Sequence, residues 1–146
     1  MRGNHARARD GFFNGGRFFR AVTADNQPDA AVKIAVIQAE ADPKKEAQFF
    51  PPIPLERTRD TGLRHLDGTL SMARATPDSA QHSFFICIAD QPKLDFGGTR
   101  NPDGQGFAAF GRVVKGMDVV RKIHARESDG QKLRKPIPIQ RIIREN

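Results

Sequence analysis

The 146-residue chain contains 38% hydrophobic and 28% charged residues, a balance typical of one compact globular domain rather than a disordered polymer. No apolar stretch approaches the roughly 18 residues that cross a bilayer, and the first twenty residues lack the apolar run of a signal peptide. Lysine and arginine exceed aspartate and glutamate by 24 to 17, but these charges are spread along the chain without interleaved aromatic residues, so we expect a cytoplasmic protein with no nucleic-acid or membrane partner.

The cysteine and the histidines do not form a metal site. Cys87 is the only cysteine, so no intrachain disulfide can form, and its apolar neighbours predict an inert thiol. The four histidines share no spacing typical of metal ligands. We therefore expect neither a metal nor any other cofactor.

The N-terminal part divides into a charged segment and a first strand. Residues 1–10 hold four charged side chains and no large aliphatic residue apart from Met1, so we expect a frayed or disordered segment followed by one domain over residues 11–146. The string Asn14-Gly15-Gly16 predicts a turn over residues 11–16. The aromatic and β-branched string RFFRAV then predicts a strand over residues 17–22.

The next two segments differ in strand character. Apolar residues alternate over residues 32–36, and Gln38 falls on the same side, which predicts a strand over residues 32–38 with one buried face. Residues 49–55 contain three prolines, which indicate an extended edge or a loop.

The middle of the chain contributes two further strands and a long loop. Residues 68–73 alternate again, and residues 84–88 form the short apolar run of a core strand, in which Phe84 and Phe85 face opposite sides. Residues 95–106 contain four glycines and one proline, which is typical of a functional loop, and they lead into apolar residues 107–110.

The last third contains the one good helix candidate. Met117, Val120 and Ile123 recur every three residues, which predicts a helix from Gly116 to about Arg126. Isoleucines near the C-terminus predict a final strand over residues 137–143. Short strands separated by glycine-rich and proline-rich loops, with a single helix, indicate a mainly β fold, either an antiparallel barrel or a sandwich.

Six segments, taken in order, resemble the cyclophilins: FFNGGRFFRAV, VIQ, DTGLRHLDGTLSMA, SFFICIAD, LDFGG and GFAAFGRVVKGMDVV. The resemblance runs from about Gly11 to the C-terminus. It implies an eight-stranded antiparallel β barrel flanked by two helices, with an active-site groove on the outside of the barrel. It also implies peptidyl-prolyl cis-trans isomerase activity, the acceleration of rotation about X-Pro bonds, which limits folding when uncatalysed.

The resemblance assigns the catalytic role to Arg20, in the string that replaces the family's FHRV-like motif, with Phe19 where a histidine is common. The reaction breaks no covalent bond, and the twisted amide nitrogen exposes a lone pair to which a fixed cation can donate. A guanidinium suits this role because it stays charged and presents several donors in a rigid plane.

By family position the remaining site residues bind substrate. Phe85 is expected to form the floor of an apolar pocket for the proline ring, with Leu94, Phe107 and Val36 as its walls. Gln38 matches a glutamine that hydrogen-bonds the peptide backbone. Ala73 and Arg74 match the segment along which the peptide main chain pairs in extended form.

Several positions depart from the family. Ala35 stands where phenylalanine is common, which predicts a shallower pocket, and Ser83 replaces a usual glutamine. Lys93 stands where some members have tryptophan, and Phe107 replaces a frequent histidine or tyrosine. These changes predict altered affinity or weaker activity rather than a different reaction.

The largest departure lies at the front of the domain. Cyclophilins normally carry two strands and a helix before the GFF-like turn, whereas only MRGNHARARD precedes it here. We therefore expect a cyclophilin-like barrel that is incomplete at the N-terminus, with one main helix and two unpaired sheet edges. Such a chain would be a fragment, a product whose true start lies upstream, or a decayed gene copy.

Two functions follow from these observations. The first is a peptidyl-prolyl cis-trans isomerase whose partners are proline-containing peptides and unfolded proteins. The alternative is a proline-peptide binding module that is catalytically weak or inactive. A nucleic-acid-binding function is a third reading, and only a steep salt dependence of DNA or RNA affinity would support it.

Overall fold

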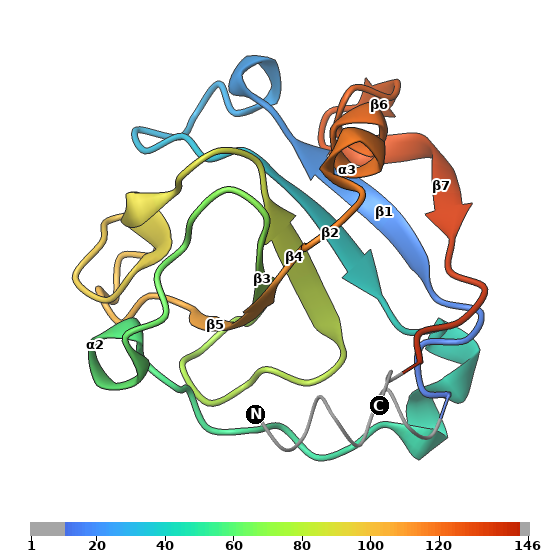
Figure 1. Cartoon of the computed structure of the whole chain (residues 1–146), viewed down its shortest axis with the longest axis horizontal. Coiled ribbons are helices and arrows are strands. Elements are labelled where there is room, and N and C mark those ends of the chain that lie inside the picture. Colours follow the sequence, from blue (N-terminus) through green and yellow to red (C-terminus); the bar gives the residue numbers. More distant parts are fainter. Residues whose placement is uncertain (1–10, 144–146) are drawn as a thin grey trace.

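The computed structural model describes residues 11–143 and shows one curved, seven-stranded sheet with antiparallel pairing throughout (Figure 1). The strand order is β5-β3-β4-β2-β1-β7-β6. The strands are β1 (Arg17–Val22), β2 (Val36–Glu40), β3 (Thr69–Met72), β4 (Ser83–Cys87), β5 (Ala108–Arg112), β6 (Ser128–Asp129) and β7 (Lys132–Pro138).

Within residues 11–143, helices are few and short. The α-helices are α2 (Thr58–Thr61) and α3 (Met117–His124), and the 3-10 helices are η1 (Ala24–Asn26), η2 (Pro43–Gln48) and η3 (Pro92–Leu94). The predicted main helix is α3, which packs against β1 and β2 through Val120 and Ile123. Between residues 11 and 143, no helix is long and apolar enough to cross a membrane.

The period-two alternation of the strands separates two apolar clusters on opposite faces of the sheet. Phe84 and Ile86 of β4 belong to the larger cluster, together with Ile37 of β2. Phe85 and its neighbours on the other face belong to a smaller cluster that includes Val36. The prediction that Phe84 and Phe85 face opposite sides is confirmed, and the smaller cluster carries the candidate site.

A β-bulge lies immediately before Arg20. Against β2, Phe18 pairs with Ala39 and Arg20 pairs with Gln38, so Phe19 is the extra residue. The pairing of β1 with β7 is also irregular between Phe18 and Arg20. Bulges bend a strand and re-aim the side chains that follow. After the shift Arg20 pairs with Gln38 of β2, which brings the two side chains together on one face.

The sheet of residues 11–143 is open, with β5 at one end and β6 at the other. This confirms the prediction of a mainly β, cyclophilin-like sheet that does not close into a complete barrel. The two end strands each have one neighbour rather than two.

Two strand predictions were wrong in their bounds. The strand predicted over residues 32–38 begins only at Val36, because the buried side chain of Gln27 holds the preceding segment through both the amide and the carbonyl of Ile34. The final strand, predicted over residues 137–143, is β7 and ends at Pro138. The segment predicted to be frayed, residues 1–10, lies outside the described residues.

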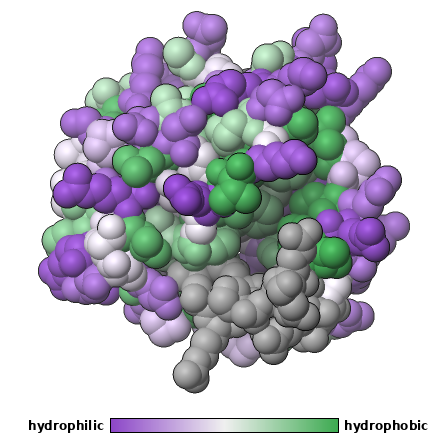
Figure 2. Space-filling view, in the orientation of Figure 1, coloured by the Kyte–Doolittle hydropathy of each residue, from purple (hydrophilic) through white to green (hydrophobic). Residues whose placement is uncertain are grey.

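Figure 2 shows how polar and apolar residues are distributed on one face of the molecule. Hydrophilic side chains cover most of the face in Figure 2, and hydrophobic residues show among them in small groups. Large exposed hydrophobic side chains include Leu63, Leu66, Val114 and Val119. Scattered exposure of this kind is ordinary for a globular protein.

Candidate active site

One cavity of about 180 Å³ gathers every site residue that the sequence predicts. Its lining consists of Arg20, Ile34, Val36, Gln38, Ala73, Arg74, Phe85, Leu94, Arg100 and Phe107. Pockets for drug-sized ligands span about 300–1,000 Å³. A cavity of this size therefore suits a single side chain better than a large ligand.

The apolar half of the cavity is built on β4 and on the segments that flank it. Phe85 is 5% exposed, and Phe107 meets it edge-on with ring centroids 5.6 Å apart. Val36 from β2 and Leu94 from η3 complete this wall and are 2% and 1% exposed. The result is a pocket of aromatic and aliphatic carbon suited to a hydrophobic ring.

Arg20 closes the polar side of the cavity, and two glutamines hold its guanidinium. Nη1 donates to Gln38 Oε1 at 2.7 Å, and Nε donates to Gln131 Oε1 at 2.9 Å. Nη2 also donates to Gln131. Burial first and the nearby Arg100 second lower the pKa of Arg20, which still remains cationic because its ordinary value is so high.

Gln38 is itself fixed by Ser83 of β4. Gln38 Nε2 donates to Ser83 Oγ at 2.8 Å, and Ser83 Oγ donates to the carbonyl of Ala39 at 2.8 Å. These bonds set the amide so that its oxygen faces Arg20. An amide has two N–H donors and two lone pairs, so Gln38 retains one of each for a ligand.

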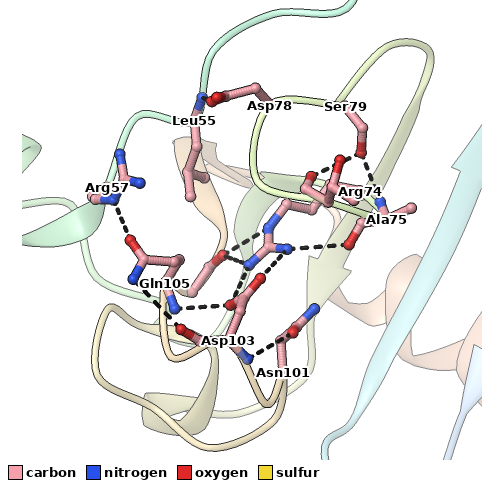
Figure 3. Close-up of polar contacts among 11 residues, drawn as sticks. Leu55, Arg57, Arg74, Ala75, Asp78, Ser79, Asn101, Asp103 and Gln105 are labelled. Carbon is pink, nitrogen blue, oxygen red and sulfur yellow. Dashed lines mark hydrogen bonds and ion pairs between the residues drawn. The ribbon is translucent and has the colours of Figure 1, made fainter.

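Arg74 lies just after β3, and its side chain hydrogen-bonds to the glycine-rich loop at residues 95–106 (Figure 3). Its guanidinium donates to Asp103 through two nitrogens at 2.9 and 3.0 Å and to the carbonyl of Gly106 at 2.9 and 2.6 Å. It also lies 4.8 Å from the ring centroid of Phe107, and the side chain is only 1% exposed. The pairing with Arg74 lowers the pKa of Asp103. The arginine side chain therefore holds Phe107 in place, and only its main chain remains for a peptide.

Arg100 enters the cavity from the same loop. Its Nη1 donates to Gln27 Oε1 at 2.9 Å and to the carbonyl of Val32 at 2.7 Å. Burial lowers the pKa of Arg100. The contact ties the loop at residues 95–106 to the segment between β1 and β2.

A buried Ser-His-Asp arrangement supports Phe85 from behind. His65 Nδ1 lies 2.7 Å from Asp95 Oδ1, and Nε2 lies 2.9 Å from Ser71 Oγ. A carboxylate accepts, so Nδ1 donates to it and Nε2 accepts from the serine. The imidazole stacks on Phe85 at 6.0 Å, and Ser71 is 0% exposed. No substrate can reach this serine, so the arrangement positions the floor of the cavity.

Ala35 and Lys93, two positions where the sequence departs from the family resemblance, do not line the cavity. Ala35 is not among the cavity-lining residues, whereas Ile34 is, so the pocket wall at this point comes from the residue before it. Lys93 lines a separate surface hollow beside Pro92 and Phe96. The shallower pocket that Ala35 was expected to cause therefore has no direct basis in the lining.

Sequence reasoning missed Gln131 and Arg100. Gln131 lies in the turn of the β6–β7 hairpin, directly before Lys132, and a backbone bond from Ala21 to its carbonyl at 2.9 Å fixes it beside β1. The dipeptide Asp129-Gly130 is the signal that could have found this hairpin, since such pairs favour tight turns. For Arg100 no pattern in the sequence separates it from other loop arginines.

A protein-family profile matches almost the whole chain. The profile of the cyclophilin type peptidyl-prolyl cis-trans isomerase/CLD family matches residues 5–144. Peptidyl-prolyl cis-trans isomerase B of Escherichia coli is 31% identical over 139 residues, which cover 94% of this chain and 78% of that protein.

Other relatives are longer than this chain. Peptidyl-prolyl cis-trans isomerase A of Dickeya dadantii is 38% identical over 114 residues, covering 77% of this chain and 53% of that protein. The chain thus spans about half the length of several curated relatives that it matches. A solved Cryptosporidium parvum cyclophilin type isomerase, crystallised in the presence of the dipeptide Ala-Pro, superposes with a TM-score of 0.68 at 20% identity, covering 99% of this chain and 84% of that one.

Proposed function

This chain belongs to the cyclophilin-type peptidyl-prolyl cis-trans isomerase family, and from that premise we propose that it accelerates rotation about X-Pro peptide bonds. The observation that carries the proposal is the placement of Arg20. A cation held by two neutral amides faces a small apolar cavity lined by Phe85 and Phe107. In this proposal the apolar side receives the proline ring and the arginine acts on the prolyl nitrogen.

Arg20 provides the electrostatic part of the mechanism. The barrier to rotation, about 18–20 kcal/mol, comes from the partial double bond of the amide. In the twisted state the nitrogen loses resonance and becomes a hydrogen-bond acceptor, so a donor fixed beside it stabilises that state more than the planar one. Gln38 and Gln131 hold the guanidinium before the substrate arrives, which removes the cost of orienting it during the reaction.

The remaining residues hold the peptide while one side of the bond turns. The proline ring packs against the apolar side chains of the cavity, which are Val36, Phe85, Leu94 and Phe107. The rest of the peptide lies along Gln38 and the main chain at residues 73–74. Gln38 keeps a free donor and a free acceptor for this purpose. Rotation then occurs about a bond whose proline side is fixed.

Proline-containing peptides and unfolded proteins are the proposed substrates. The Cryptosporidium structure of the same fold, obtained with Ala-Pro present, supports a proline-peptide ligand. No cofactor enters the mechanism, because the reaction transfers no atom or electron.

The test is the rate of cis-trans exchange in a proline-containing peptide, measured by NMR exchange spectroscopy. A charge-assisted hydrogen bond contributes about 1.5–3 kcal/mol, so Arg20→Ala should lower kcat/KM by about ten-fold to a hundred-fold. The matched control is Arg17→Ala on the same strand, because Arg17 is exposed and pairs with Glu40 outside the cavity. This control should retain the wild-type rate.

Two other outcomes would overturn the proposal. If Arg20→Ala isomerises the peptide as fast as the wild-type chain, Arg20 is not the catalytic residue. If the wild-type chain binds the peptide but gives only the uncatalysed rate, the chain is a proline-peptide binding module.

A further inference from the structure

Arg20 and Arg100 are two cations beside one cavity without an acidic partner. Among residues 11–143, neither guanidinium lies within ion-pair distance of a carboxylate. By contrast Arg17, Arg74 and Arg121 each pair with an aspartate or glutamate. Three arginines line the cavity, and of these only Arg74 has a carboxylate partner.

Both guanidiniums are partly buried and are held only by neutral groups. Arg100 donates to the amide oxygen of Gln27 and to the backbone carbonyl of Val32. A cation taken out of water is costly unless an opposite charge compensates it. A ligand that carries a negative charge would therefore be stabilised at this site, because it would compensate the two partly buried cations.

Arg100 also lines a second hollow, of about 830 Å³, next to the cavity. This hollow runs along residues 26–32 and reaches Gln131, the residue that holds Arg20. Asp29 is its one acidic lining residue, is exposed, and makes no ion pair with Arg100. A peptide whose proline occupies the cavity can thus continue past Arg100 into open space.

We propose that Arg100 is a specificity-determining residue that pairs with a carboxylate flanking the proline, so that the site prefers acidic X-Pro segments. This inference rests on the isomerase function proposed above and names its substrate class. Because Arg100 pairs with the carboxylate, Arg20 remains free to donate to the prolyl nitrogen. The carboxylate comes either from an aspartate or glutamate side chain or from a chain terminus directly after the proline.

The first experiment compares peptides that differ only in charge. Two pairs are N-acetylated, C-amidated tetrapeptides. In the first pair glutamate or glutamine stands directly before the proline, and in the second directly after it. In the third pair the peptide ends one residue after the proline, with either a free or an amidated carboxyl group. We expect kcat/KM to be about five- to twenty-fold higher for the charged member of at least one pair. The pair that responds identifies the source of the carboxylate.

Variants and salt then assign the preference to Arg100. Arg100→Gln should bring the ratio of charged to neutral peptide close to one, and Arg100→Lys should keep part of the preference. The matched control is Arg121→Gln, which removes one positive charge from α3 outside both hollows and should keep the wild-type ratio. Raising the salt concentration to about 0.5 M should reduce the wild-type ratio, because charge pairs near the surface are screened.

Equal rates for charged and neutral members of all three pairs would refute the proposal, as would an unchanged ratio in folded Arg100→Gln. If Arg100→Gln does not fold, the comparison of charged and neutral peptides with the wild-type chain, and its salt dependence, still test the proposed preference for a carboxylate. If the chain isomerises no peptide, the proposed function fails, and the carboxylate preference is then measured as the difference in affinity between the glutamate and glutamine peptides by titration calorimetry.

Discussion

Replacing Gln131 by methionine tests how much the orientation of Arg20 contributes to catalysis. Methionine has similar length but accepts no comparable hydrogen bond, so Gln131→Met removes two of the three bonds that hold the guanidinium, leaving the one to Gln38. A hydrogen bond to a charged group contributes about 1.5–3 kcal/mol net. Gln131 is only half-buried, so in the variant water can replace part of the lost hydrogen bonding to Arg20. We therefore expect the loss of transition-state stabilisation to lie near the lower end of this range.

A loss of about 1.4 kcal/mol corresponds to a ten-fold fall in rate. In the proposed mechanism Arg20 acts mainly on the twisted state, so the fall should appear in kcat, with KM nearly unchanged. The assay is exchange spectroscopy at several peptide concentrations. Gln81→Met is the matched control, since Gln81 bonds the backbone of Phe50 outside the cavity and its loss should leave kcat unchanged.

A double-mutant cycle separates positioning from general damage. If Gln131 acts through Arg20, then Gln131→Met should have no further effect in an Arg20→Ala background. Wild-type kcat in a folded Gln131→Met variant would refute the reasoning. So would a full additional loss in the double variant, because it would mean that Gln131 acts independently of Arg20.

Three further predictions concern the frame around the site. Burial lowers the pKa of His65 more than Asp95 raises it. As the pH falls, this histidine is therefore protonated in the unfolded chain before it is protonated in the folded chain. The free energy of unfolding should therefore fall as the pH drops below about 6.5, and thermal unfolding at about pH 7.5 and about pH 5.5 should show a dependence that His65→Asn lacks. In Gly98→Ala the new Cβ would lie 2.3 Å from the carbonyl oxygen of Lys93, so urea denaturation should show a loss of about 1–3 kcal/mol, and an unchanged midpoint would contradict this packing. Burial raises the pKa of Cys87 to about 12, so a thiol reagent at about pH 8 should label this residue only in denaturant, and rapid labelling of the folded chain would show that the thiol is accessible.

The sequence predicted the site better than it predicted the strands around it. Local sequence patterns located β1, β3, β4 and α3, because each of these elements combines apolar or aromatic residues with recognisable spacing or flanking turns. No strand was predicted at β5, where only an apolar run after the loop was noted. The family resemblance then named eight residues, and all eight line one cavity. Their catalytic and binding roles stay predictions until the variants are measured.

The errors came from side-chain bonds that leave no periodic pattern. Apolar alternation over residues 32–36 resembles a strand, but Gln27 bonds the backbone of Ile34, and Arg100 bonds that of Val32, in place of a neighbouring strand. In the same way β7 carries mainly charged residues at its start, so its pairing with β1 could not be recognised from hydrophobicity. Gln131 was missed together with this hairpin.

The two anchors of Arg20 lie at very different distances along the chain. Gln38 is separated from Arg20 by 18 positions and Gln131 by 111. Contacts that close long loops carry a larger entropic cost and are expected to form late in folding. On a ribosome, Arg20 and Gln38 are synthesised well before Gln131, so a nascent chain would hold the arginine by one amide only. Full orientation of Arg20 would then require the β6–β7 hairpin to dock against β1, so the proposed isomerase activity would develop fully only after this contact has formed.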